Sequence, residues 1–136
     1  MRNGLWAVLL NSVMGGLQAG GIPEQAVFTF DPPIADSVAL NFSDSDDLLP
    51  KRGDFRIESC LLMSNPSGER WAVLTLVNQS TSQRLLDEEH IVALFADGTR
   101  RHPLNAGHTF RGGERNTLTL NFGDNPFPVV RVEVRQ

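Results

Sequence analysis

Apolar and polar residues alternate along much of this chain, and this alternation restricts the fold more than any other feature of the sequence. In residues 117–122, TLTLNF, an apolar residue occupies every second position. Residues 130–136, VRVEVRQ, repeat the pattern with valines between charged residues. Successive side chains of a β-strand point to opposite faces, so a period of two predicts a strand with one buried and one solvated face. The same period predicts strands in VALNF, residues 38–42, and in FRI, residues 55–57.

More continuous apolar runs lie between these segments and predict central strands: CLLM at 60–63, WAVLTLV at 71–77 and IVALF at 91–95. Turns rich in proline and glycine, such as Asp97-Gly98, separate the runs at short intervals. Residues 85–95 fit a short helix or a strand, and the Asp-Gly turn favours a strand that folds back into a second, short strand. The chain is therefore predicted to be all-β, an antiparallel sandwich of seven to eight strands.

The first twenty residues differ from the rest. Arg2 precedes an apolar stretch at 5–14, and small residues follow it. This order is typical of a secretory signal peptide, and the stretch is too short to span a bilayer as an ordinary helix. We expect residues 1–20 to be a signal peptide, residues 21–136 to form a single β-sandwich domain, and the protein to be periplasmic or secreted. An amphipathic N-terminal helix packed on the domain is the alternative.

Three segments resemble parts of a known architecture. A strand ends in a polar turn in LTLVNQS, and a glycine turn precedes an alternating strand in FRGGERNTLTLNF. The third segment is VALFADG. With them, residues 25–135 resemble, at fold level, the immunoglobulin-like and fibronectin-like modules of bacterial secreted proteins. The resemblance implies an antiparallel immunoglobulin-like β-sandwich and carries no function with it. The cysteine pair of antibody domains is absent.

Cysteine content and net charge exclude a disulfide within the chain and argue against a nucleic-acid partner. Cys60 is the chain's only cysteine, so a disulfide within the chain is excluded and the thiol is expected to be buried as a small hydrophobe. The formal net charge of -4 argues against a generic phosphate-binding surface. We therefore expect no nucleic-acid partner.

Two of the histidines offer a metal hypothesis. His102 and His108, with Asp97, could converge at one end of the sandwich, where imidazole and carboxylate would suit zinc or copper. A periplasmic metal-binding protein or an enzyme using this end is therefore an alternative. Against it, the three histidines lie near predicted turns, where we expect surface side chains, and no Gly-x-Ser-x-Gly nucleophile motif occurs. We expect neither a cofactor nor catalysis.

The stretch NPSGERW at 65–71 allows a second alternative. Together with FRGGER at 110–115, it is similar to two loops of the immunoglobulin-like inhibitors of papain-like proteases, whose third loop, Arg-Pro-Trp, has no counterpart here. The resemblance would imply that these loops enter a protease cleft. Against it, Trp71 shares a predicted strand face with Val73 and Val77, which predicts a core anchor and makes NPSG a hairpin turn.

The main hypothesis is an exported, non-catalytic module that contacts another extracytoplasmic protein through strand edges or end loops. The terminal VVRVEVRQ is the most suggestive edge, with arginines on its solvated face. Phe127, Arg131 and Arg135 are the predicted binding residues. We expect no stable membrane span.

Overall fold

The structure is a computed structural model that describes residues 21–35, 37–42 and 47–136. Within these ranges it contains nine strands and no α-helix, which confirms the all-β prediction, although the seven to eight strands predicted are fewer than those observed. The strands are β1 (Thr29–Phe30), β2 (Phe55–Ser64), β3 (Glu69–Asn78), β4 (Arg84–Leu86), β5 (Val92–Phe95), β6 (Arg100–Arg101), β7 (His108–Phe110), β8 (Arg115–Asp124) and β9 (Val129–Glu133). The 3₁₀ helices are η2 (Glu24–Ala26) and η3 (Glu88–His90). The predicted signal peptide lies outside the described residues.

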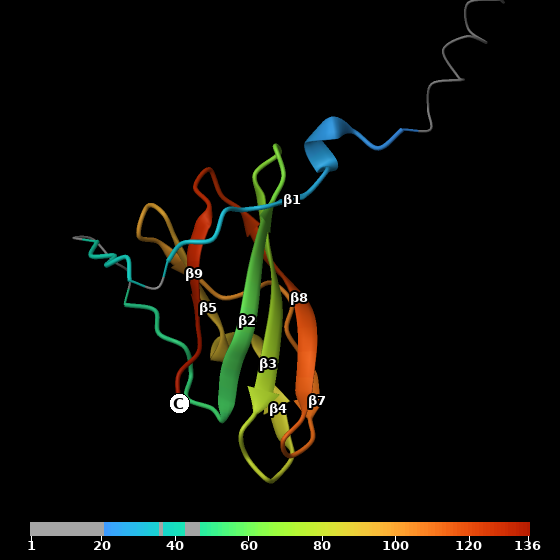
Figure 1. Ribbon diagram of the computed structural model, residues 1–136, viewed down its shortest axis with the longest axis vertical. Coiled ribbons are helices and arrows are strands. Elements are labelled where there is room, and N and C mark those ends of the chain that lie inside the picture. The colour runs from blue at the N-terminus through green and yellow to red at the C-terminus, as the bar shows by residue number, and fades with distance from the viewer. Residues whose placement is uncertain (1–20, 36, 43–46) are drawn as a thin grey trace, which may run out of the picture.

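The strands pair into three antiparallel sheets. Their orders are β1-β2-β3-β8, β6-β5-β9 and β4-β7. Figure 1 shows the long strands β2, β3 and β8 along the length of the molecule, with β9 and β5 beside them. Side chains from both of the larger sheets meet in one apolar cluster, an arrangement compatible with a β-sandwich.

The core follows from the alternation on the long strands. On β3 the buried apolar residues are Ala72, Leu74 and Leu76, and on β8 they are Leu120 and Phe122. β5 is buried along its whole length, as expected for a central strand. The other buried members of the cluster are Phe55, Leu86, Ile91, Phe110 and Val129. The predicted inward face of 117–122 is thus confirmed.

The Asp97-Gly98 turn also behaves as predicted. Gly98 has a φ of 90°, and the Phe95 N–H donates to the Thr99 carbonyl at 2.9 Å. This closes the hairpin between β5 and the two-residue strand β6. The alternative of a short helix over residues 85–95 is wrong, because this segment contains parts of the strands β4 and β5, and only η3 (Glu88–His90) between them is helical.

The prediction that Trp71 anchors the core is wrong. The buried residues of β3 begin at Ala72 and recur at every second position, so Trp71 and Val73 lie on the opposite face. There the Phe28 ring packs edge-on against the indole, with ring centroids 5.7 Å apart, and Trp71 stays half-buried. Both faces of this strand carry large apolar residues, so the alternation could not tell which face is covered.

The strand predicted at residues 38–42 is absent as well. The segment carries no strand assignment, Val38 is 43% exposed, and Phe42 packs against Gly98. Figure 1 shows the chain leaving β1 and crossing toward β9 before it reaches this segment. Alternation produces a strand only where a neighbouring edge offers backbone partners, and this segment has none among the described residues.

No helix in the described ranges is long and apolar enough to cross a membrane.

Candidate functional site

Two strand edges open onto one groove, which we call the β2–β9 groove. Its volume is about 800 Å³, within the range typical of ligand sites. β2 and β9 lie side by side in Figure 1 and form its two walls. Residues 57–62, residues 130–132 and, at one end, residues 30–34 line it.

The groove runs along the strand edges rather than over one face of a sheet. Both walls are lined by consecutive residues, whereas one face of a strand would contribute only every second residue. The Leu62 carbonyl points to this edge, because it accepts the Asp31 N–H at 2.8 Å. Backbone groups alternate between the two edges of a strand, so Cys60, two residues earlier, directs its N–H and C=O into the groove.

The walls of the groove are apolar. Ile57, Cys60 and Leu62 on β2 pack against the core together with Val132 on β9, yet none of them is fully buried. The apolar cluster between the two larger sheets is therefore partly open to solvent along this edge. At the rim, Phe30 is 64% exposed and Leu61 is 53% exposed.

The chain's own N-terminal segment reaches this edge but does not fill it. β1 pairs with β2 only at Met63 and Ser64. Pro32 and Pro33 follow at once, and proline has no N–H with which to continue a ladder. The prolines end the pairing and line one end of the groove, so no described segment of the chain pairs with the strand position along residues 57–61.

The outer edge of β8, in contrast, is covered. The Leu104 N–H donates to the Asn121 carbonyl at 2.7 Å, and the Asn105 side-chain oxygen accepts the Asn121 N–H at 2.8 Å. A loop thus occupies both backbone groups of Asn121 on this edge, a common kind of protection against unwanted pairing. The open β2 edge lacks an equivalent cover in the part of the chain that the structure describes.

Three charged residues line the groove, and two of them are already engaged. The Asp31 carboxylate accepts the Ser64 hydroxyl at 2.8 Å, and Glu58 forms a bidentate pair with Arg115. The hydrogen bond from Arg115 lowers the pKa of Glu58 from its ordinary value. Among the described residues, Arg131 makes one hydrogen bond, from Nη2 to the Val38 carbonyl, at 3.4 Å.

Cys60 is a neutral part of the wall. Burial raises the pKa of its thiol to about 11, so the sulfur carries a proton at neutral pH. A protonated thiol is a weak nucleophile. Its chemistry suits packing rather than catalysis.

The three predicted binding residues are spread along and beyond β9. Arg131 lies in the groove. Phe127 is 46% exposed in the turn before β9, where its N–H donates to the Asn125 side chain at 2.9 Å. Arg135 is exposed beyond the other end of the strand, and its carbonyl accepts the Gly53 N–H at 2.9 Å. Only Arg131 belongs to the groove.

The metal hypothesis receives no geometric support. His102 Nδ1 lies 2.8 Å from the Ile91 carbonyl oxygen, whereas His108 Nε2 lies 3.0 Å from a Glu114 carboxylate oxygen. Asp97 instead accepts the hydroxyl and the N–H of its neighbour Thr99. Across the described ranges, no three His, Cys, Asp or Glu side chains come together in a way that could hold a metal ion.

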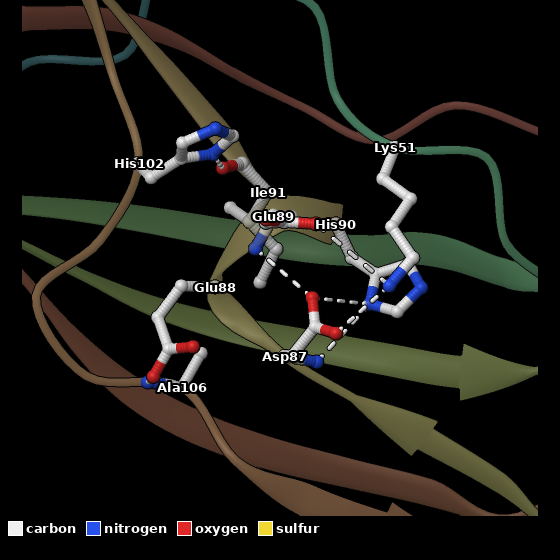
Figure 2. Close-up of polar contacts among 8 residues, drawn as sticks. All are labelled: Lys51, Asp87, Glu88, Glu89, His90, Ile91, His102 and Ala106. Atoms are coloured by element: carbon white, nitrogen blue, oxygen red, sulfur yellow. Dashed lines mark hydrogen bonds and ion pairs between the residues drawn. The ribbon is translucent and has the colours of Figure 1, made fainter.

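His90 corrects the expectation that all three histidines lie on the surface. It is only 7% exposed, with its ring edge-on to Phe55 and against Gly53. In Figure 2 the His90 ring and the Lys51 ammonium both point toward Asp87, while His102 lies apart from them. The hydrogen bond from Lys51 lowers the pKa of Asp87 from its ordinary value. These contacts fasten the segment before β2 to η3 and have a structural role.

The two loops that resemble those of protease inhibitors lie far apart. The NPSG turn precedes β3, whereas residues 111–114 lie beside the far end of that strand, where the Asn78 N–H donates to the Glu114 carbonyl at 2.9 Å. Ten residues of extended strand separate them, roughly 30 Å. They do not form one continuous surface.

Sequence reasoning missed the β2 wall, residues 57–62. Alternation shows that a segment is a strand but not which of its edges lacks a neighbour. The Pro32-Pro33 pair was the available signal, because it must end any ladder that enters it. Comparison of the chain with protein families, curated proteins and solved structures found no match.

Proposed function

We propose that this protein is an exported, non-catalytic interaction module with an immunoglobulin-like sandwich fold. It binds an extended segment of another extracytoplasmic protein, which adds as a strand in the β2–β9 groove. The observation that carries the proposal is the strand position along β2 with which no described segment pairs, beside a partly exposed apolar wall.

Strand addition combines two favourable terms. The incoming backbone can pair with Cys60, and each such hydrogen bond contributes about 0.5–1.5 kcal/mol net. Its inward side chains would cover Ile57 and Val132, at about 25 cal/mol per Å² of apolar surface buried. The partner segment is therefore extended, with apolar residues at every second position. Because ordering a peptide is unfavourable, we expect affinities in the micromolar range, about -8 kcal/mol.

The test uses a capped peptide of about six residues in which valine alternates with threonine, long enough to follow the exposed edge. Calorimetry is expected to show binding, and bound peptide should slow the modification of Cys60 by a thiol reagent at pH 9. A peptide of the same composition with its valines grouped together should bind at least about tenfold more weakly, because it cannot present one apolar face.

Two lysine substitutions make a matched pair. Leu61→Lys places a charge on the rim of the groove and should weaken binding at least about tenfold, since charged edge residues oppose strand pairing. Leu85→Lys changes an equally exposed leucine on β4, outside the groove, and should have no effect. Unfolding curves establish that both variants fold. Absence of binding to the wild type, or equal weakening by both variants, would refute the proposal.

Export is tested separately. A signal peptide ending at Ala19 or Gly20 predicts that protein recovered from the periplasm or medium begins near Gly21. Mass spectrometry of that protein measures the start directly. An intact N-terminus would contradict export by this route.

A further inference from the structure

We propose that the segment bound in the β2–β9 groove carries a carboxylate that pairs with Arg131. This inference rests on the proposed function, because it specifies the chemistry of the strand that the groove accepts. It starts from the charges on the groove wall and from what each of them already contacts.

Arg131 is the cation of the groove, and its one hydrogen bond among the described residues is weak. Its single hydrogen bond goes to a neutral carbonyl, that of Val38, at 3.4 Å, beyond the usual 2.7–3.2 Å range of such bonds. No ion pair of Arg131 occurs among the described residues. The side chain is half-buried on the wall, so part of its hydration is already lost.

The two anions of the groove are satisfied within the chain. Asp31 holds the Ser64 hydroxyl, and Glu58 is paired with Arg115 on β8. Neither of them requires a cation from a partner. Within the described part of the chain, Arg131 is therefore the one charged residue of the groove without an ion pair or a short hydrogen bond, and it would attract a negative charge beside β9.

A carboxylate would bind Arg131 more strongly than the Val38 carbonyl does. An arginine–carboxylate hydrogen bond is charge-assisted, frequently bidentate and roughly twice as strong as a bond to a neutral acceptor. The Val38 contact is long and can be exchanged. A lysine or arginine at the same position of the bound strand would instead face Arg131 at close range and be rejected.

The acid must occupy a particular side of the bound strand. Val132 packs against the core, and its strand neighbour Arg131 points to the opposite face of β9. The acid therefore belongs to the outward side chains of the bound strand, which recur at every second residue. Acids pointing the other way would not reach Arg131, and an acid at the proline-lined end would approach Asp31. The structure thus predicts a positional preference for the acid, beyond a general attraction of acidic peptides.

The experiment is a positional scan of the valine–threonine peptide. One glutamate, and in parallel one glutamine, replaces each residue in turn, and calorimetry gives each affinity. We expect glutamate to exceed glutamine about tenfold at positions that recur with a period of two, and to give no gain between them. Arg131→Gln should abolish this preference, and Arg131→Glu should convert it into a preference for lysine. Arg135→Gln, which removes a nearby arginine outside the groove, should leave it unchanged.

The outcomes separate the two proposals. If glutamate and glutamine peptides bind equally at every position, or if the preference survives Arg131→Gln, the assignment of the carboxylate is wrong while strand addition stands. If neither the neutral nor the charged peptides bind, the proposed function fails. A uniform gain from glutamate at all positions, lost in high salt, would indicate non-specific attraction and overturn the pairing with Arg131.

Discussion

Asp87 joins several elements through one side chain. Its carboxylate accepts hydrogen bonds from Lys51 at 2.9 Å and from the Glu89 N–H at 3.0 Å, and it caps η3. These contacts link the segment before β2 to η3, the 3₁₀ helix that leads into β5. They lower the pKa of Asp87, chiefly through the bond from Lys51.

The lowered pKa predicts a pH dependence of stability. A carboxyl whose folded pKa lies below its unfolded value, here 3.8, adds stability that is fully present above that value. The contribution is lost as the pH falls through the lower, folded pKa. Asp87→Asn keeps a capping oxygen but removes the charge. We expect it to lower the free energy of unfolding at pH 6. The difference between the wild type and this variant should shrink as the pH falls toward 2.

The matched control is Lys51→Met, which removes the largest cause of the shift and keeps a long side chain. Denaturant unfolding at several pH values should show a weakened acid dependence in this variant, and the double variant should add little to either change. Full additivity of the two substitutions would show that the Lys51–Asp87 contact does not cause the effect.

At the scale of elements, the turn between β7 and β8 packs closely against the loop after β3. A Cβ atom on Gly112 would lie 2.2 Å from the Thr81 carbonyl oxygen, whereas one on Gly113 would meet no atom within 4 Å. Gly113 has instead a φ of 74°, which disfavours other residues. Two adjacent glycines are thus required for different physical reasons.

Alanine substitutions should separate these reasons. Gly112→Ala forces two backbone segments apart and is expected to cost roughly 3 kcal/mol of unfolding free energy. Gly113→Ala adds only left-handed backbone strain, about 1–2 kcal/mol. Chemical denaturation measures both, and Gly113→Asn, which tolerates positive φ better, should recover part of the loss. Equal costs for the two alanines would contradict the close approach at Gly112.

The elements also show what could be predicted from the sequence. Segments such as 117–122 were identified correctly because alternation is a local property of a strand. The strand expected at 38–42 did not form, since pairing depends on a neighbouring edge that no local pattern encodes. The shortest strands, such as β1, contain too few residues to show a period. Arg131 was predicted as a binding residue because it lies on the solvated face of an alternating strand. Cys60 on the facing wall was predicted only as core, because the sequence does not show which strand edge lacks a neighbour.

For the whole molecule, the property that matters most for binding is that the two sides of its largest sheet are covered to different extents. The β8 edge is covered at Asn121 by the loop at Leu104 and Asn105, whereas no described residue covers the β2 edge beside the groove. An exposed edge is a template for pairing with another chain. In the sheet that contains β2, β3 and β8, the open side among the described residues is therefore that of β2, and extension of this sheet from both sides would require the β8 edge as well.

This asymmetry predicts the effect of uncovering the other edge. Asn105→Ala removes the acceptor of the Asn121 N–H and should speed hydrogen exchange at that amide about tenfold, the factor for a local loss of about 1.4 kcal/mol. With both sides of this sheet available for pairing, the variant should also show a higher average mass at high concentration by sedimentation. Leu104→Ala, whose backbone bond to Asn121 is retained, serves as the control and should remain like the wild type. Faster exchange without any gain in mass would show that the loop protects the amide but does not limit self-association.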